Sequence, residues 1–174
     1  MAAPIPILEL STVGVEGGDL LHALHRACFV DDTGEAWRRE DLIEVLGLDS
    51  TSAMILSERL SPRQPSEPVG YAIYRIVGGE CELLSIGVHP DARRRGLGRQ
   101  LLDAIMSACR LAGVGRMFLE VRDDNVAAFR LYRGLGFAVV GRRTAYYRAG
   151  DGRRRDALTM SRAITDKAPD TSSP

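Results

Sequence analysis

The residues whose types and spacing most clearly suggest chemistry are arginines and glycines that follow an apolar strand. They read Arg93-Arg94-Arg95-Gly96-Leu97-Gly98-Arg99. Glycines let a backbone approach a ligand closely, and the first amides of a helix have no partner inside that helix. The helix dipole adds partial positive charge, and arginines add forked donors that suit phosphate oxygens. We therefore predict a phosphate-binding site where this strand passes into a helix.

The basic run alone leaves other interpretations open. Three consecutive arginines can form a solvated charged surface or a nucleic-acid patch, and G-x-G pairs also occur in nucleotide and dinucleotide folds. The P-loop pattern G-x-x-x-x-G-K-[ST] is absent, however, and Leu101 stands where G-x-G-x-x-G requires its third glycine. The sequence therefore favours phosphate binding outside those two fold classes.

A single carboxylate interrupts an apolar strand. Glu120 lies in Met117-Phe118-Leu119-Glu120-Val121, where an inward carboxylate would be partly desolvated and suited to act as a general base. A glutamate on the solvent face of an edge strand has the same spacing. The residues alone do not choose between these two interpretations.

A tyrosine on a predicted helix is a second candidate for acid-base chemistry. Tyr132 follows Asn125 by seven residues, so both lie on one side of the helix about two turns apart. Its hydroxyl could protonate a leaving group, or its ring could simply pack beside Phe129 and Leu135.

The elements that must position these residues alternate in type. Hydrophobic periodicity and turn residues predict strands over residues 5–10, 53–56, 69–77, 81–88, 116–121, 137–140 and 157–160. The same criteria predict helices over residues 19–29, 35–46, 96–112 and 125–135. Residues 57–68 are expected to be a surface loop, and Tyr146, Tyr147 and a Gly-Asp-Gly turn to lie between the last two strands. The order predicts a mixed α/β sheet.

Length and charge limit the function classes. The 174 residues fit one domain over residues 1–164, followed by a frayed tail over residues 165–174. The 23 basic and 23 acidic side chains cancel, which argues against a general nucleic-acid binder. No segment resembles a signal peptide or approaches the ~20 apolar residues that span a bilayer. We expect a cytoplasmic protein without membrane or direct nucleic-acid partners, monomeric or weakly dimeric.

The cysteines and histidines do not suggest a metal site. Cys28, Cys81 and Cys109 are widely spaced and lack a C-x-x-C pair, so buried thiols in a reducing compartment are expected. His22 and His25 are three residues apart on one predicted helix, but no carboxylate or cysteine cluster accompanies them. The prediction is that the protein binds no metal.

These segments together resemble the GNAT superfamily of N-acetyltransferases. Arg93-x-x-Gly96-x-Gly98 is similar to the acetyl-CoA signature [RQ]-x-x-G-x-[GA], and residues 119–128 and 131–137 resemble the second half of the same fold. Residues 142–160 are similar to the end of the RimI branch, the ribosomal-protein-alanine N-acetyltransferases. The resemblance covers roughly residues 68–163, whereas the N-terminal third, with Trp37 later than that branch places its Pro-Trp element, departs from it. It implies the GNAT (acyl-CoA N-acyltransferase) fold, α/β with a mixed, mostly antiparallel central sheet flanked by helices.

The resemblance also assigns roles. Acetyl-CoA is the implied donor, with Glu120 as general base and Tyr132 as general acid. The implied cofactor-binding residues are Ile86, Gly87, Val88, Arg93, Arg94, Arg95, Gly96, Leu97, Gly98, Arg99 and Asn125. The segment with Tyr146 and Tyr147 borders the peptide groove in the RimI pattern, so one of the two is expected to contact the acceptor, although both could simply pack in a strand. A bulge at Gly87 would free a backbone N–H for the acyl oxygen, unless that glycine only packs closely against a helix.

The acceptor is the least specified part. A protein α-amine, with a reference pKa near ~8, is about a tenth neutral at pH 7, whereas a lysine with a pKa near ~10.4 is neutral less than about a thousandth of the time. One carboxylate base therefore suits an α-amine better. The leading hypothesis is direct acetyl transfer, in a ternary complex, to the N-terminal alanine of a small-subunit ribosomal protein. The alternatives are an acetyltransferase of a small amine (polyamine, amino acid or aminoglycoside) and a non-catalytic acyl-CoA-binding module.

Overall fold

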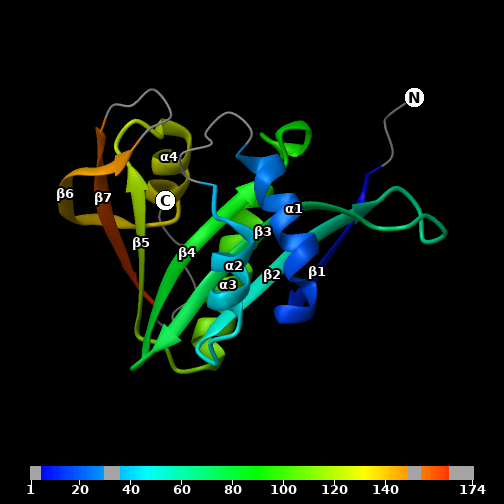
Figure 1. Cartoon of the computed structure of the whole chain (residues 1–174), viewed down its shortest axis with the longest axis horizontal. Coiled ribbons are helices and arrows are strands. Elements are labelled where there is room, and N and C mark those ends of the chain that lie inside the picture. Colours follow the sequence, from blue (N-terminus) through cyan, green and yellow to red (C-terminus); the bar gives the residue numbers. More distant parts are fainter. Residues whose placement is uncertain (1–4, 30–35, 149–153, 165–174) are drawn as a thin grey trace, which may run out of the picture.

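The computed structural model describes residues 5–29, 36–148 and 154–164 (Figure 1). Its strands are β1 (Ile7–Val13), β2 (Thr51–Arg59), β3 (Glu67–Val77), β4 (Glu80–Val88), β5 (Arg116–Arg122), β6 (Ala138–Arg148) and β7 (Arg154–Ala163). Its α-helices are α1 (Gly18–Cys28), α2 (Arg39–Leu46), α3 (Leu97–Leu111) and α4 (Val126–Gly134). Two short 3₁₀ turns, η1 (Val15–Gly17) and η2 (Pro90–Ala92), precede α1 and α3.

The strands form one mixed sheet in the order β1-β2-β3-β4-β5-β7-β6. β4 pairs with β5 in parallel, and the remaining neighbouring pairs are antiparallel. The parallel pair is possible because α3 crosses over between the two strands, as parallel neighbours require. The predicted mixed, mostly antiparallel sheet is confirmed, and the expected edge strand is β1.

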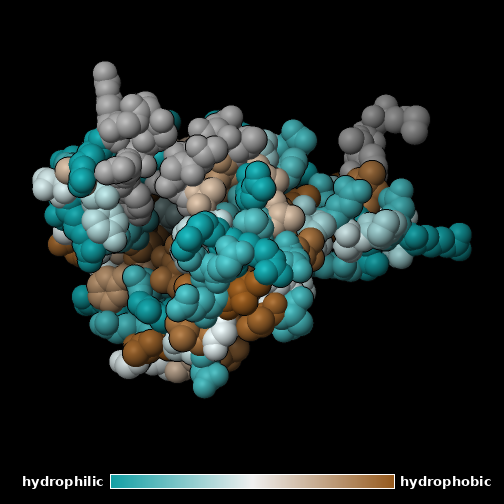
Figure 2. Space-filling model, in the orientation of Figure 1, coloured by the Kyte–Doolittle hydropathy of each residue, from teal (hydrophilic) through white to brown (hydrophobic). Residues whose placement is uncertain are grey.

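Helices cover both faces of the sheet. Figure 1 shows α1 and α2 in front of the strands and α3 behind them. On the α3 side the core is built around fully buried side chains of that helix, including Leu101, Leu102 and Ile105. On the α1 side Leu21 and Leu42 pack over Tyr71 and Ile73 of β3. Figure 2 shows hydrophilic side chains over α2, as expected for the outward side of an amphipathic helix.

Several predicted strand bounds were too short. The expected loop over residues 57–68 shrinks to residues 60–66, because β2 extends to Arg59 and β3 begins at Glu67. The placement of Tyr146 and Tyr147 between strands was wrong, since both lie within β6, which pairs with β7 as a long hairpin. Cross-strand pairing extended these strands beyond their apolar segments, a contribution that periodicity does not register. The Gly-Asp-Gly turn and residues 165–174 lie outside the described residues.

The buried state predicted for the cysteines is confirmed. Cys28, Cys81 and Cys109 are free thiols and buried. Within the described part of the chain, no helix is long and apolar enough to span a membrane.

Candidate active site

The sheet opens between β4 and β5. Their parallel pairing runs from Glu80–Arg116 to Leu83–Leu119 and goes no further in the described structure. Beyond it, the amide of His89 donates to the Val69 carbonyl of β3. Backbone N–H and C=O groups of successive strand residues point to opposite neighbours, so those of Gly87 also point toward β3. Those of Ile86 and Val88 point toward the gap. The gap therefore presents backbone amides without a strand partner among the described residues.

The bulge that opens this gap is not where the sequence suggested. The register between β3 and β4 shifts between Ile73–Ser85 and Tyr74–Leu83, which makes Leu84 the extra residue. Gly87 instead pairs regularly with Tyr71, and an added Cβ there would lie 2.8 Å from Cβ of Cys28 in α1. The prediction of a bulge at Gly87 was wrong. Close packing of β4 against α1 explains the glycine.

The predicted phosphate cradle lies at the start of α3. Arg94 and Gly96 have φ of 66° and 79°, so two left-handed residues turn the chain into the helix. The first main-chain helix bond runs from Gln100 to the Gly96 carbonyl, and no side chain of the described residues caps the helix. The amides before Gln100 are therefore available to an anion. An added Cβ at Gly98 would lie 3.2 Å from Leu131 of α4, so glycine also permits close helix packing.

The arginines of the cradle divide into two groups. Arg94 and Arg99 line the cavity at the helix start. Arg93 also borders it, but its guanidinium donates to the carbonyls of Val88 (3.2 Å) and Cys28 (2.8 Å), which ties the cradle to β4 and α1. Arg95 lies outside the cavity lining and binds Glu58 of β2, with one nitrogen–oxygen distance of 3.1 Å. Arg94 and Arg99 are therefore better placed for phosphate than their neighbours.

A cavity of about 990 Å³ joins the cradle to the gap between β4 and β5. This volume lies at the upper end of ordinary ligand sites. Of the predicted site residues, the cavity is lined by Ile86, Gly87, Val88, Arg93, Arg94, Gly96, Leu97, Gly98, Arg99, Glu120, Asn125 and Tyr132. The α1 side of the same cavity is formed by Cys28, Phe29, Ala36 and Trp37.

The carboxylate of Glu120 lies on the α1 and α2 side of the sheet. Its neighbours Leu119 and Val121 point into the opposite core, so strand alternation turns Glu120 away from that core. The side chain is 23% exposed, and Oε1 lies 3.1 Å from Nε of Arg143 in β6. Arg143 in turn stacks over the ring of Tyr146, 5.2 Å from its centroid. Glu120 is thus a half-buried carboxylate in the cavity, paired with an exposed cation.

The tyrosine and asparagine of α4 also reach the cavity. The ring of Tyr132 is buried and meets Phe137 edge-to-face at 6.0 Å, while the residue lines the cavity. The packing interpretation is therefore confirmed, and the role of Tyr132 as general acid stays a prediction. Asn125 is the N-cap of α4, because Oδ1 accepts the amide of Ala128 at 3.1 Å. The side-chain oxygen of Asn125 therefore binds the backbone at the start of α4.

One cysteine lies closer to the cavity than the sequence suggested. Cys28 ends α1 and contributes to the lining. Burial raises the pKa of its thiol to about 11, against the opposing effect of Arg93. Because the thiolate is the nucleophilic form, this cysteine is poorly suited to carry an acyl group.

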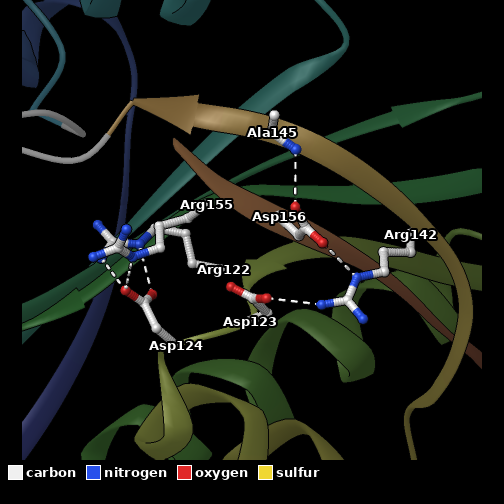
Figure 3. Close-up of polar contacts among 7 residues, drawn as sticks. All are labelled: Arg122, Asp123, Asp124, Arg142, Ala145, Arg155 and Asp156. Carbon is white, nitrogen blue, oxygen red and sulfur yellow. Dashed lines mark hydrogen bonds and ion pairs between the residues drawn. The ribbon is translucent and has the colours of Figure 1, made fainter. Parts of the chain in front are cut away.

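The β6–β7 hairpin is anchored to the loop between β5 and α4 by charged side chains (Figure 3). Asp124 binds Arg122 and Arg155, with distances of 2.8–2.9 Å. Arg142 bridges Asp156 and Asp123, and Asp156 also accepts the amide of Ala145. The Arg122 contact, with that of Arg155, lowers the pKa of Asp124 to about 2. The hairpin that carries Arg143 and Tyr146 is thereby held beside Glu120.

Of the two tyrosines predicted to contact the acceptor, only Tyr146 has a described side chain. Tyr146 is half-exposed and reaches the site through its stacking with Arg143, although it does not line the cavity. The side chain of Tyr147 lies outside the described residues.

Sequence reasoning missed Arg143 and the anchoring acids. Asp123 and Asp124 lie within residues 119–128, which carry part of the family resemblance but gave no separate signal for an ion pair. Arg143 is 23 positions from Glu120, and no spacing rule links residues on β5 and β6, which are separated by β7. The only local signal was the adjacent pair Arg142-Arg143, which also fits a solvated strand face.

Comparisons with known proteins agree with this geometry. The pattern described as the acetyltransferase (GNAT) family matches residues 19–137. The [ribosomal protein bS18]-alanine N-acetyltransferase of Escherichia coli strain K12 is 40% identical over 102 residues, or 59% of this chain and 68% of that protein. N-alpha-acetyltransferase RimI of Mycobacterium tuberculosis is 44% identical over 102 residues, or 56% of this chain and 61% of that protein. The crystal structure of the Escherichia coli ribosomal-protein-S18-alanine N-acetyltransferase has a TM-score of 0.79 at 26% identity, covering 96% of this chain and all of that one.

Proposed function

Because this chain belongs to the acetyltransferase (GNAT) family, we propose that it transfers an acetyl group from acetyl-CoA to the N-terminal alanine of ribosomal protein bS18. The observation that carries the proposal is the single cavity that joins an uncapped, arginine-flanked helix start to a half-buried carboxylate. The names of the relatives supply the acceptor.

The donor binds across the opening of the sheet. The amides at the start of α3, with Arg94 and Arg99, hold the pyrophosphate of coenzyme A. The amides of Ile86 and Val88 face the gap, where they bind the pantetheine arm and the acyl oxygen. Asn125 fixes the start of α4 at the thiol end.

The acceptor amine enters from the side of Glu120 and the β6–β7 hairpin. Its positive charge takes the place of the Arg143 guanidinium beside Glu120. Arg143 is 58% exposed and stacks over the ring of Tyr146. An α-amine needs only a modest base, because roughly a tenth of it is already neutral at pH 7. One carboxylate therefore suffices.

The reaction is a direct transfer. Glu120 accepts a proton from the ammonium, and the neutral amine attacks the thioester carbon, so that a C–N bond forms and the carbonyl oxygen takes the electron pair. The carbonyl then re-forms as the C–S bond breaks with its electron pair on sulfur, and Tyr132 protonates the departing thiolate. The second proton of the attacking nitrogen replaces the one that Tyr132 gave up, and Glu120 releases its proton to solvent. No acyl-enzyme is formed, in keeping with the protonated thiol of Cys28.

A peptide screen tests the substrate. The purified chain is given acetyl-CoA and a peptide with the alanine N-terminus of bS18, the same peptide with an acetylated N-terminus, and a panel of polyamines, amino acids and aminoglycosides. Mass spectrometry is expected to find one acetyl group on the free N-terminal alanine and none on the blocked peptide. If only small amines are acetylated, the ribosomal acceptor is wrong and the chain is an acetyltransferase of a small amine. If no amine is acetylated, the remaining alternative is a non-catalytic acyl-CoA-binding module.

A further inference from the structure

A second cavity begins beside Glu120. It has a volume of about 580 Å³ and is lined by side chains from the neighbouring strands β3, β4, β5, β7 and β6, among them Arg75, Glu82, Phe118 and Thr159. Glu120 lines this cavity as well as the one that contains the cradle. The volume lies within the range of ligand sites. We call this second cavity the sheet groove, and the steps of acetyl transfer do not use it.

Strand register places the lining of the sheet groove on one face of the sheet. Glu82 pairs with Arg75 of β3 on one side and with Phe118 of β5 on the other. Two residues further along β5, Glu120 pairs with Thr159 of β7. Residues two apart in a strand point to the same face, and each such step covers about 7 Å. The groove therefore extends along the strands from Glu120 to the level of Phe118.

The sheet groove is open because the helices on this face cover other strands. The helices α1 and α2 pack against β2, β3 and β4, and Figure 1 shows them in front of these strands, beside β5 and β7. Phe118 is consequently half-buried, whereas its neighbours Met117 and Leu119 are buried in the core on the opposite face. The exposed guanidinium of Arg116 lies 6.0 Å from the centroid of the Phe118 ring. The groove thus offers a ligand an aromatic ring on an otherwise uncovered part of the sheet.

Charged pairs border this ring and can exchange partners. Nη2 of Arg75 lies 2.5 Å from Oε2 of Glu82, and the two side chains are 42% and 46% exposed. Toward the cradle, Glu120 and Arg143 form a second pair that also lines the groove. Exposed ion pairs are weakly held, so either partner can turn to a polar or charged group of a ligand. An apolar floor between adaptable polar sides suits a polypeptide better than a wholly apolar ligand.

The position of the sheet groove indicates which polypeptide it takes. In the proposed reaction, acetyl-CoA fills the cavity from the cradle to the gap, and the acceptor amine lies at Glu120. A small amine would end there and leave the groove empty. A polypeptide continues beyond its first residue and, when extended, advances about 3.3 Å per residue. Its third residue would then lie about 7 Å from the first, at the level of Phe118.

We propose that the sheet groove binds the second to fourth residues of the acceptor polypeptide, and that Phe118 contacts the side chain of the third. The inference rests on the proposed function for the place of the acceptor amine. Contacts away from the reacting amine contribute binding energy that raises kcat/KM. The groove thereby selects polypeptides over small amines that carry the same reacting group. The other route from Glu120 leads past Trp37 and Tyr146, and the two routes predict different contacts.

A series of acceptor lengths tests the groove. Peptides with the first two, three, four and five residues of bS18, beginning at the alanine and amidated at the C-terminus, are acetylated under the same conditions. Burying about 50 Å² of apolar surface on Phe118 corresponds to about a tenfold gain, so kcat/KM should rise about tenfold between two and four residues. In Phe118→Ala this rise should fall to about twofold or less, with the Kd for acetyl-CoA unchanged. No rise in wild type, or an equal rise in Phe118→Ala, would overturn the inference.

Phe129→Ala is the matched control. Phe129 is also a half-buried phenylalanine, but it packs from α4 against the α3 core and lines neither cavity. Its variant should keep the full rise with peptide length. Because the rise is a ratio measured within one protein, a loss of folded protein cancels, and thermal unfolding reports that loss separately. A rise that disappeared in both variants would assign the effect to general destabilisation and count against the groove.

Photo-cross-linking locates the peptide directly. The third residue of the bS18 peptide is replaced by benzoylphenylalanine, coenzyme A is bound in place of acetyl-CoA to prevent turnover, and the protein is digested with trypsin before mass spectrometry. Trypsin cleaves after arginine and lysine, so cross-links in the groove are expected on fragments 117–122 and 156–162. The route past Trp37 and Tyr146 would label fragments 27–38 and 144–148 instead. Labelling of the latter fragments alone, or no labelling by a peptide that wild type acetylates, would overturn the inference.

Activity and cross-linking together separate the groove from the identity of the acceptor. If wild type acetylates the bS18 peptide but the cross-links avoid fragments 117–122 and 156–162, the proposed acceptor stands and the groove is wrong. If wild type acetylates no bS18 peptide, the substrate proposal is wrong, and a cross-link in fragment 117–122 would still show a peptide in the groove. Absence of both acetylation and cross-links would remove both proposals.

Discussion

At the scale of single residues, the pairing of Glu120 with Arg143 sets the conditions for the chemistry. Glu120 and Arg143 form an ion pair, with Oε1 3.1 Å from Nε, on the side from which the acceptor ammonium is proposed to enter. The partner is 58% exposed and can move into solvent at little cost, because exposed ion pairs contribute only about 0–1 kcal/mol. An incoming ammonium can therefore displace the guanidinium and take its place beside the carboxylate.

Glu120→Gln tests the base directly. Removing the carboxylate while keeping its size should lower kcat at least about 100-fold, as for loss of a general base, and leave the Kd for acetyl-CoA nearly unchanged. Steady-state kinetics and calorimetry measure the two quantities. Glu9→Gln is the matched control, since Glu9 lies on the edge strand β1 and pairs with Arg59 outside the cavity lining. An unchanged kcat in Glu120→Gln would remove the residue from the mechanism.

The Cys28 thiol provides a second prediction at this scale. Because burial holds its pKa near 11, we expect Cys28→Ala to retain acetyl transfer, apart from a packing effect beside Gly87. Intact mass spectrometry of wild type with acetyl-CoA and no acceptor should find no acetyl group on this thiol. A stoichiometric acetyl-cysteine that a peptide then discharges would contradict direct transfer.

At the scale of elements, we expect the start of α3 to bind the donor. The glycine turn exposes amides, and two of the four arginines of the run contact other parts of the fold instead of pointing freely into the cavity. Charge alone would treat the four arginines as equivalent. The contacts of Arg95 with β2, and of Arg93 with β4 and α1, distinguish these two arginines from Arg94 and Arg99.

Arg99→Ala and Arg95→Ala separate the two groups. Losing one charge-assisted contact costs about 1.5–3 kcal/mol, so Arg99→Ala should raise the Kd for acetyl-CoA about tenfold or more. Arg95→Ala, which removes the contact with Glu58, should leave that Kd unchanged. Titration calorimetry at two salt concentrations measures both. S-acetylpantetheine, which lacks the pyrophosphate, should bind the Arg99→Ala variant and wild type equally. Equal weakening by both variants would mean a diffuse charge effect.

At the scale of the whole molecule, the hairpin anchor connects stability to pH. The pKa of Asp124 is lowered to about 2, chiefly by its hydrogen bonds to Arg122, whereas an unfolded aspartate titrates near 3.8. Between these values the unfolded chain binds more protons than the folded one, so stability falls as the pH decreases through this window. Above it the contribution of Asp124 is complete.

Asp124→Asn should therefore destabilise the protein in a pH-dependent way. Its melting temperature should lie below that of wild type at pH 6, and the difference should shrink between about pH 4 and pH 2. Differential scanning calorimetry across this range gives the comparison, with the exposed Asp49→Asn as control. A constant difference at every pH would assign the effect to shape and not to charge.

Much of the fold could be predicted because its signals are local. The helix α3, the glycine turn before it and the start of α4 near Asn125 each depend on residues within one or two turns of each other. Strand ends were less predictable, since β6 and β7 extend through cross-strand pairing along polar segments such as residues 141–148. Glu120 and Tyr132 do line the cavity, but their own elements left their roles open, and it was the family resemblance that singled them out.

The sequence by itself determined a glycine turn flanked by arginines at a helix start, a carboxylate on an apolar strand and a sheet of mixed direction. These follow from side-chain type and periodicity, which act over short distances along the chain. Only the tertiary structure decided that Leu84 and not Gly87 forms the bulge, that Arg95 turns to Glu58, and that Arg143 faces Glu120. Such choices depend on strand register and on packing between distant segments. A shift of one residue in strand register changes which side chains share a face of the sheet, and no local sequence pattern specifies that register.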